Sequence, residues 1–178
     1  SLQTTRMAFH AIKAGEGDVF ISAGVETVSR FGVGAADGAP NSKNSLFDDA
    51  QARTLKQAEG ATEWHDPRED GVLPDVYIAM GQTAENVVLA TGISREDQDH
   101  WGVRSQNKAE EAINAGFFER EIVPVTLPDG TIVSKDDGPR AGTTYEKISQ
   151  LQPVFRPNGT ITAGNACPLN DGAAALVI

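Results

Sequence analysis

The chain has 178 residues, and its 25 Asp and Glu outnumber its 15 Lys and Arg, which gives a formal net charge of −10. This acidic balance argues against a nucleic-acid-binding protein, because such proteins present a basic face to phosphates. The single Cys excludes a disulfide framework and a Cys-based zinc site, and no apolar stretch reaches the roughly 18 residues that span a membrane.

Both ends of the chain have the sequence of regular secondary structure. Residues 2–14 carry apolar side chains at helical spacing, and Gly15 is a suitable residue to end that helix. Residues 172–178 are apolar and predict a buried strand. Domains commonly end in polar, frayed segments, so we expect a piece of a longer protein. The alternative is a compact domain with ordered ends.

The first part of the chain predicts an α/β architecture with an insertion. Residues 19–25 are apolar with little alternation, which is typical of a strand in a sheet covered on both faces. A helix, a tight turn and a buried strand in succession favour the α/β class. Residues 31–76 are rich in Gly, Pro and Asn, and we expect a surface insertion that carries one helix over 47–59.

Two further helices are predicted over 83–90 and 95–115. Gly92 and Gly116 follow them as helix-ending residues, and Ser94 with Asp97 resembles a capping arrangement at the start of the second.

Strand residues follow these helices. Residues 117–127 and 131–133 flank a Pro-Asp-Gly turn and predict a hairpin. A capping box of Thr143 and Glu146 predicts a short helix to Leu151, and residues 160–163 predict another strand.

The residues by themselves show no catalytic set. Cys167 would need a base or a helix N-terminus to become a nucleophile, and its small neighbours favour a packing or pocket-lining role. The three His side chains, at positions 10, 65 and 100, lack partners at diagnostic spacing, and the acidic stretch 65–70 is better explained as a charged surface loop than as a cation site. Glu85 is explained by the first turn of its predicted helix, where a carboxylate interacts well with the helix dipole. We expect no metal site.

Four separated groups of segments carry a more specific signal. In chain order they are Ser1–Gln3 with Ala23–Ser29; Met80–Asn86; Ser94–Asp99 with Ser105–Ala109 and Glu121–Val125; and Pro153–Phe155 with Thr162–Asn165 and Asn170–Ala175. In this order and spacing they resemble the thiolase family, the acetyl-CoA acetyltransferases and 3-ketoacyl-CoA thiolases. The resemblance covers nearly the whole chain and is weakest over 31–76.

The resemblance implies part of a thiolase-type α/β/α/β/α layered domain. Residues 1–30 and 160–178 would belong to the N-terminal core domain, and residues 31–159 would form an inserted loop domain on the coenzyme A side of the active site. We therefore expect the strands at 19–25 and 173–178 to share one sheet.

The implied activity is a ping-pong acyl transfer between a Cys nucleophile and coenzyme A, which makes or cleaves 3-ketoacyl-CoA in fatty acid metabolism and β-oxidation. The resemblance places the nucleophile just before Ser1, and the catalytic His and a second Cys after Ile178. We therefore expect no catalytic residue in this chain, and no activity from the chain alone.

The resemblance instead assigns this chain residues that contact coenzyme A. The implied pantetheine channel is lined by Met80, Phe155, Ala163, Gly164 and Cys167, and the implied neighbours of the nucleotide are Arg140 and Lys147. Cys167 stands where relatives often carry Ser, and Ala79 where some biosynthetic relatives carry His. Arg140 and Lys147 could attract an anionic ligand locally despite the acidic whole.

The implied partners are acyl-CoA and coenzyme A as substrates, with no covalently bound cofactor, and a second copy of the subunit in a homodimer. A tetramer is less favoured, because residues 31–76 do not resemble the family's tetramerisation loop. Cysteine usage favours a reducing compartment, and we expect a cytoplasmic location. Two alternatives stay open: a non-catalytic thiolase-like protein that binds acyl-CoA, and an unrelated interaction domain.

Overall fold

The structure is a computed structural model that describes residues 2–30 and 43–178. It divides into two compact units, one made of Ser1–Lys43 with Leu169–Ile178, and the other of Asn44–Pro168. Ser1 and residues 31–42, with which the predicted insertion begins, lie outside the described residues. The assignment of the chain to a core domain and an inserted loop domain stays a prediction.

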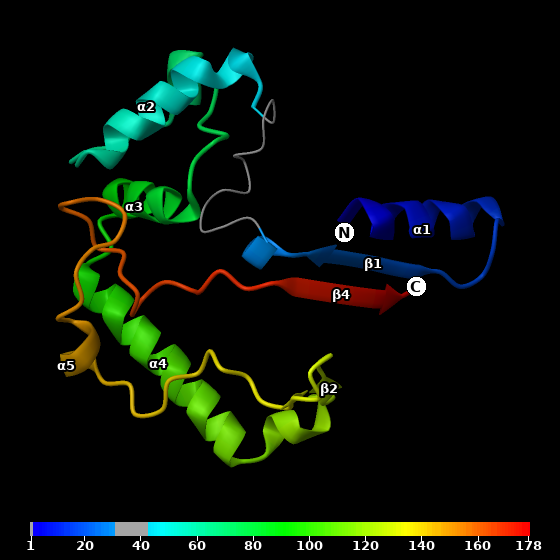
Figure 1. The fold of residues 1–178 in the computed structure, drawn as a ribbon. Coiled ribbons are helices and arrows are strands. Elements are labelled where there is room, and N and C mark those ends of the chain that lie inside the picture. The colour runs from blue at the N-terminus through cyan, green and yellow to red at the C-terminus, as the bar shows by residue number, and fades with distance from the viewer. Residues whose placement is uncertain (1, 31–42) are drawn as a thin grey trace. The chain divides into compact units, whose positions relative to one another are not determined.

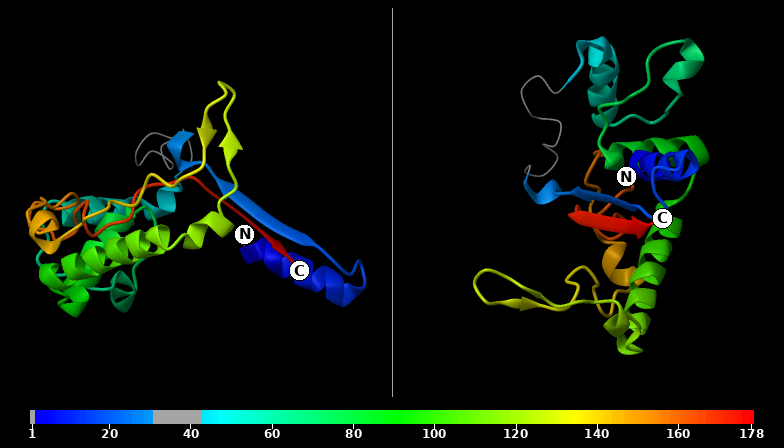
Figure 2. Two further views of the ribbon diagram at one scale, coloured as in Figure 1. Left: turned by 90° about the horizontal axis from the view of Figure 1, so that it is seen from below. Right: turned by 90° about the vertical axis from the view of Figure 1, so that its right-hand side faces the viewer.

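The first unit joins the two ends of the chain in one sheet. Helix α1 (Leu2–Ala14) precedes strand β1 (Ile21–Glu26), which pairs antiparallel with β4 (Gly172–Val177) so that Ala23 lies opposite Ala175 (Figure 1). Figure 2 shows α1 along one face of this strand pair. The expected helix over 2–14 and the expected sheet shared by the two ends are both confirmed.

Polar contacts fix this unit on both sides of the strand pair. The hydroxyl groups of Thr4 and Thr5 on α1 lie 2.7 and 3.0 Å from Oγ of Ser22. Beyond the other end of β1, the backbone N–H and the hydroxyl of Ser29 donate to the carboxylate of Asp171 at 2.8 and 2.6 Å. The first contacts hold α1 on β1, and the contact between Ser29 and Asp171 supports the register of β1 against β4 in addition to the strand ladder.

The prediction that these strands are buried on both faces is wrong for the described residues. Val25 is 75% exposed and Val177 is 78% exposed. The physical reason is that α1 is the helix packed on this two-stranded sheet among the described residues, and two strands and one helix cannot enclose both faces.

The second unit is mainly helical. Its elements are η2 (Ser45–Phe47), α2 (Asp48–Ala58), η3 (Pro67–Asp70), α3 (Met80–Thr91), α4 (Arg95–Asn114), η4 (Phe117–Arg120), β2 (Val125–Thr126), β3 (Ile132–Val133) and α5 (Tyr145–Ile148). Two predicted helix ends are confirmed. Gly92 ends α3 with a φ of 73°, and Ser94 begins α4, where its hydroxyl accepts the N–H of Asp97 at 3.0 Å.

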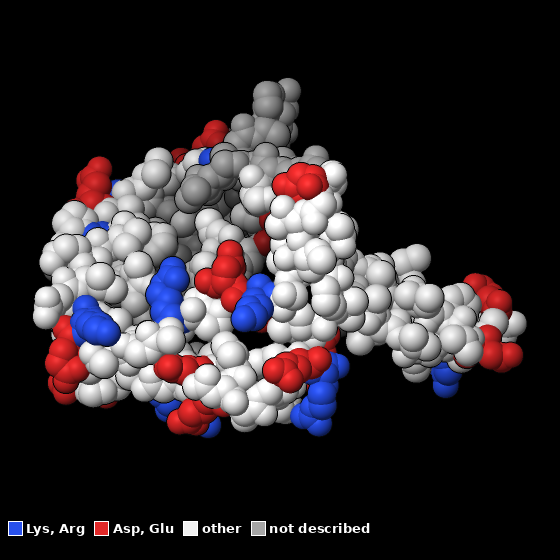
Figure 3. Space-filling model, turned by 60° about the horizontal axis from the view of Figure 1, so that its bottom comes forward, with Lys and Arg blue, Asp and Glu red and all other residues white. Residues whose placement is uncertain are grey.

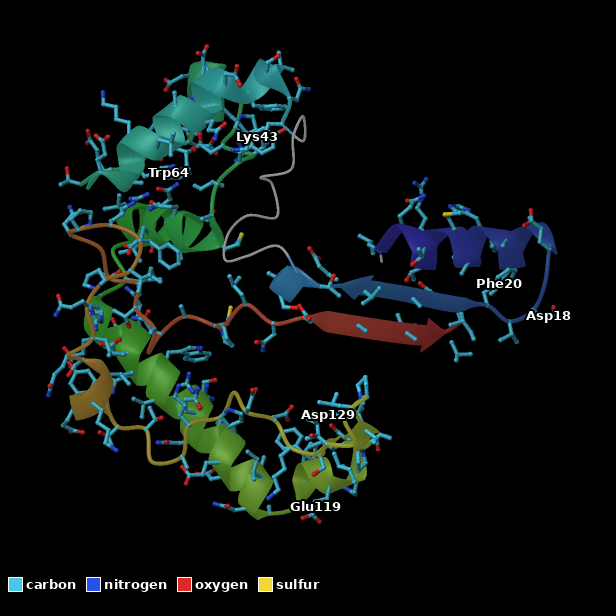
Figure 4. All side chains as sticks on the ribbon, viewed as in Figure 1. Asp18, Phe20, Lys43, Trp64, Glu119 and Asp129 are labelled. Carbon is cyan, nitrogen blue, oxygen red and sulfur yellow. The ribbon has the colours of Figure 1, made fainter. Side chains whose placement is uncertain are left out.

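Two predicted elements differ from the structure in this unit. The strand expected over 117–127 is reduced to β2, because residues 117–120 form the 3-10 helix η4, and the hairpin pairs β2 with β3. Asp129 stands at the hairpin tip, where its carboxylate accepts the N–H of Thr131 at 2.9 Å (Figure 4). Residues 160–163 form no strand and end in a turn.

The predicted capping box at α5 is also wrong. Thr144, not Thr143, is the residue that precedes the helix, and its side chain accepts no capping hydrogen bond. The Thr143 hydroxyl instead donates to the carbonyl of Arg140 at 2.6 Å.

Helix α4 packs closely on the turn that contains Gly164. A Cβ at Gly102 of α4 would lie 2.6 Å from the carbonyl oxygen of Gly164. A glycine is therefore required here by close approach, although it weakens a helix by about 1 kcal/mol relative to Ala.

We expect Gly102→Ala to lower the free energy of unfolding of the full-length protein by about 1–3 kcal/mol, because overpacking outweighs the gain in helix propensity. Urea denaturation measures this change. Gly138→Ala is the matched control, since a Cβ at Gly138 would meet nothing within 4 Å, and its effect should stay within about 0.5 kcal/mol. A Gly102→Ala protein more stable than the wild type would contradict the close approach.

The turn at η3 holds a carboxyl group, that of Asp66, whose pKa is strongly lowered. Arg68 donates from Nε to Asp66 at 2.9 Å, and its backbone N–H donates to the same oxygen at 3.0 Å. These contacts, the side-chain bond first, lower the pKa of Asp66 from its ordinary 3.8 to about 2. Because the pKa is depressed, the contact stabilises the fold above about pH 4 and is lost as the pH falls towards 2.

In Arg68→Ala we expect the pKa of Asp66 to rise towards 3.8 without reaching it, since the backbone bond remains. Carboxyl NMR of protein with labelled Asp measures the titration. Asp129 is the internal control, because Thr131 lowers the pKa of that carboxyl independently of Arg68. An unchanged Asp66 titration would refute the role of the Arg68 side chain.

Candidate functional site

The residues expected to contact coenzyme A fall on three segments of the second unit. Met80 begins α3, Arg140 and Lys147 lie before and within α5, and the remainder belong to residues 154–167. We call residues 154–166 the 154–166 loop.

Met80 and Phe155 are brought to one place through Gly81. A Cβ on Gly81 would overlap the ring of Phe155, so the ring lies directly on the backbone of the first turn of α3. The adjacent Met80 side chain is 77% exposed. An aromatic face and an exposed thioether therefore form an apolar surface at the start of α3, as a pantetheine contact would require.

Below that surface, α3 turns a polar face inward. Gln82, Glu85 and Asn86 follow helical spacing, and all three are buried. Glu85 is only 3% exposed, and its carboxylate accepts the backbone N–H groups of Thr160 and Ile161, each at 2.9 Å. The explanation of Glu85 by the helix dipole is therefore wrong: α3 begins at Met80, so Glu85 lies in its second turn and binds the 154–166 loop.

Arg156 completes this contact from the loop side. Its Nε donates to the side-chain oxygen of Gln82 at 2.7 Å, and its Nη2 donates to the side-chain oxygen of Asn86. Arg156 is 4% exposed, and burial lowers the pKa of its guanidinium while the charge of Glu85 opposes that change. Within the described part of the chain, Nη1 of Arg156 has no hydrogen-bond partner.

Helix α4 holds the other end of the same loop through Asn165. The Asn165 amide donates to Asp99 of α4 at 2.9 Å and to the carbonyl of Thr160 at 3.0 Å, and its oxygen accepts the N–H of Thr162 at 2.8 Å. This turn presents Ala163 to solvent. Gly164 packs inward, where a Cβ would lie 2.8 Å from Ile148 of α5.

The sequence reasoning missed the residues that support the loop, namely Gln82, Arg156 and Asn165. The sequence carries no clear signal for them, because three polar residues on one face of a helix, such as Gln82, Glu85 and Asn86, are ordinary for a helix at the surface. Their partners, about 75 residues away in sequence, could not be read from local patterns.

Arg140 and Lys147 form a second group around α5, held by α4. Gln106 accepts the backbone N–H of Arg140 at 2.8 Å, and Glu110 accepts that of Gly142 at 2.9 Å. Lys147 is exposed and donates from Nζ to the carbonyl of Gly142 at 2.9 Å. On the face drawn in Figure 3, acidic and basic side chains are interspersed.

Cys167 and the His residues show no catalytic arrangement in the described chain. Cys167 is a free, exposed thiol. His65 lies 3.6 Å from Glu69 and 3.5 Å from Asp70 on the surface, and His100 stacks on Tyr145 at 4.3 Å. No group of His, Cys, Asp and Glu among residues 2–30 and 43–178 could hold a metal ion. In the same residues no helix has the length and apolar character needed to cross a bilayer.

A separate cavity of about 270 Å³ lies elsewhere in the second unit. Its lining includes Trp64, which Figure 4 shows between α2 and α3, together with Ile78 and Val87. The seven residues predicted to contact coenzyme A do not line it. The cavity therefore does not coincide with the predicted pantetheine surface.

Comparison with known proteins gives one consistent result. The model of the thiolase N-terminal domain matches residues 1–178. A beta-ketoadipyl-CoA thiolase of Acinetobacter baylyi is 40% identical over 188 aligned positions, which cover 100% of this chain and 43% of the relative. A probable acetyl-CoA acyltransferase of Staphylococcus aureus is 37% identical over 99% of this chain and 43% of the relative. The chain thus spans less than half the length of these curated relatives.

Solved structures agree with the sequence matches. The dimeric peroxisomal thiolase of Saccharomyces cerevisiae superposes with a TM-score of 0.72 at 32% identity, over 99% of this chain and 40% of that one. Human mitochondrial 3-ketoacyl-CoA thiolase, solved in complex with CoA, gives a TM-score of 0.64 at 28% identity, over 99% of this chain and 41% of that one. The chain therefore has the α/β thiolase fold over its length and belongs to the thiolase family.

Proposed function

We propose that the protein containing this chain is an acetyl-CoA C-acyltransferase that makes or cleaves 3-ketoacyl-CoA. The observation that carries this proposal is the thiolase N-terminal match over all 178 residues, supported by 40% identity to a beta-ketoadipyl-CoA thiolase. Within that activity the described residues supply the part of the site that binds coenzyme A.

The proposed contribution of this chain is binding and orientation of the acyl-CoA. The exposed side chain of Met80 and the ring of Phe155 offer apolar contacts of the kind a pantetheine arm needs. The turn at Ala163 and Gly164 brings backbone close to solvent, where a narrow ligand can approach it. Arg140 and Lys147 offer positive charge for the nucleotide phosphates.

The proposed covalent chemistry belongs to residues outside this chain. In cleavage, a Cys thiolate attacks the keto carbon of 3-ketoacyl-CoA. The carbon–carbon bond to the acetyl-CoA unit then breaks, the electron pair stays on the acetyl-CoA carbon, and that carbon takes up a proton. The thiolate of free coenzyme A then attacks the acyl-enzyme thioester and releases the Cys. Cys167 takes no part in these steps in our proposal, because its thiol is exposed and the proposed nucleophile lies outside this chain.

We also propose that the complete subunit forms a homodimer. The support is its likeness to a thiolase described as dimeric, with a TM-score of 0.72. Light scattering of the complete protein tests this: a dimer mass supports the proposal, whereas a monomer or a tetramer contradicts it.

The activity is tested by a thiolysis assay on the full-length protein with acetoacetyl-CoA and coenzyme A. We expect acetyl-CoA to form in the wild type, and no turnover from the 178-residue chain assayed alone. A full-length protein that binds coenzyme A without turnover would favour a non-catalytic acyl-CoA-binding protein instead.

Cys167→Ser in the full-length enzyme should keep most of the turnover, because Ser is similar in size and a channel-lining thiol is not the nucleophile. The same thiolysis assay measures this. Loss of a true nucleophile costs about a thousandfold or more, so a loss on that scale would mean that Cys167 performs chemistry.

A further inference from the structure

Gln82 binds two consecutive residues of the 154–166 loop with one side-chain amide. Its Nε2 donates to the carbonyl of Phe155, and its oxygen accepts Nε of Arg156 at 2.7 Å. An amide is suited to this task because it carries a donor and an acceptor on one planar group. The contact fixes the peptide that joins Phe155 to Arg156.

The position of the Phe155 ring follows from that peptide. The ring lies on the backbone of Gly81, one residue before Gln82, and Gly81 leaves it no room to move closer. Gln82 is itself only 8% exposed, so it lies beneath the surface that a ligand would touch. The most direct route from Gln82 to a ligand is therefore through Phe155, whose carbonyl it binds.

Stability alone is a poor explanation for these polar groups. Burying an amide and a guanidinium carries a desolvation cost that well-packed apolar side chains avoid. The polar contacts instead define orientation, because hydrogen bonds fix the relative orientation of two groups more closely than apolar packing does.

We propose that Gln82 is a positioning residue that holds Phe155 in the orientation required to bind the pantetheine arm of acyl-CoA. This inference rests on the proposed function, since it presumes that the ring of Phe155 contacts acyl-CoA. Gln82 touches neither the substrate nor the reacting atoms.

Two variants of the full-length enzyme separate positioning from stability in a thiolysis assay with acetoacetyl-CoA. Gln82→Met has similar length and removes both hydrogen bonds, whereas Gln82→Glu keeps an acceptor for Arg156 and removes the donor to Phe155. We expect KM to rise about tenfold in both, because both lose the hydrogen bond to Phe155 and tenfold is the scale of one lost hydrogen bond, while kcat changes less than about threefold. Thermal unfolding should show a smaller loss of stability in Gln82→Glu than in Gln82→Met.

Asp75→Asn is the matched control for a buried polar contact in the same unit. The Asp75 carboxylate, 7% exposed, accepts Nη2 of Arg53 at 2.7 Å and lies outside the 154–166 loop. This variant should lose stability while its KM stays within about twofold of the wild type, because it leaves Phe155 in place.

A double-mutant cycle decides whether Gln82 acts through Phe155. In a Phe155→Ala background, Gln82→Met should change KM less than about twofold, because the ring that Gln82 positions is gone. A KM within twofold of wild type in the single Gln82 variants, or an equal effect with and without the Phe155 ring, would overturn the proposal. If the wild type neither turns over acetoacetyl-CoA nor binds coenzyme A, the proposed function itself fails, and that outcome is seen before any variant is made.

Discussion

The second unit depends on the contact between the buried polar face of α3 and the 154–166 loop. Glu85 illustrates the constraint. Its carboxylate is almost fully removed from water, and its compensation comes from two backbone N–H groups of the loop. A buried carboxylate that lost those donors would be left unpaired at a cost of several kcal/mol, so helix and loop must form together. A Cβ at Gly159 would also overlap the Glu85 carboxylate, which explains why a glycine stands at this position.

The loop owes its shape to side chains because it has no strand ladder of its own. A few backbone bonds cross it, such as that from Val154 N–H to the carbonyl of Ile161 at 3.0 Å. Further backbone groups bind side chains: Glu85 and Gln82 of α3, and Asn165, which Asp99 of α4 holds in turn. Such a segment keeps one conformation only while its backbone donors and acceptors are paired. This suits a surface that must meet a ligand in a defined shape, and it places the supporting residues a layer below those exposed to solvent.

Elements with local causes could be predicted from the sequence, and elements with distant causes could not. The helices α1, α2, α3 and α4 were predicted because their spacing and caps, such as Ser94 and Gly92, lie within a few residues. The burial of β1 depends on what lies across the sheet, and the conformation of 160–163 depends on Glu85 and Asn165. Likewise, the residues predicted to contact coenzyme A were assigned by family resemblance, since a Met or Phe side chain carries no signal of its own.

An acidic chain can still bind an anionic ligand, because only the charges close to the ligand act on it strongly. A net charge of −10 is spread over the whole chain, and exposed charges more than about 10 Å apart are largely screened at physiological salt. What a phosphate would sense is the local field, and α4 fixes the backbone around Arg140 and Lys147 through Gln106 and Glu110. The carboxylate of Glu110 accepts the N–H of Gly142, so it holds this segment in place and also adds a negative charge beside it. The same helix therefore supports the segment that carries Arg140 and Lys147, the predicted nucleotide contacts, and, through Asp99 and Gly102, the turn that presents Ala163. Predicted phosphate and pantetheine contacts thus share one rigid element, which would keep the two ends of an extended ligand in a fixed relation.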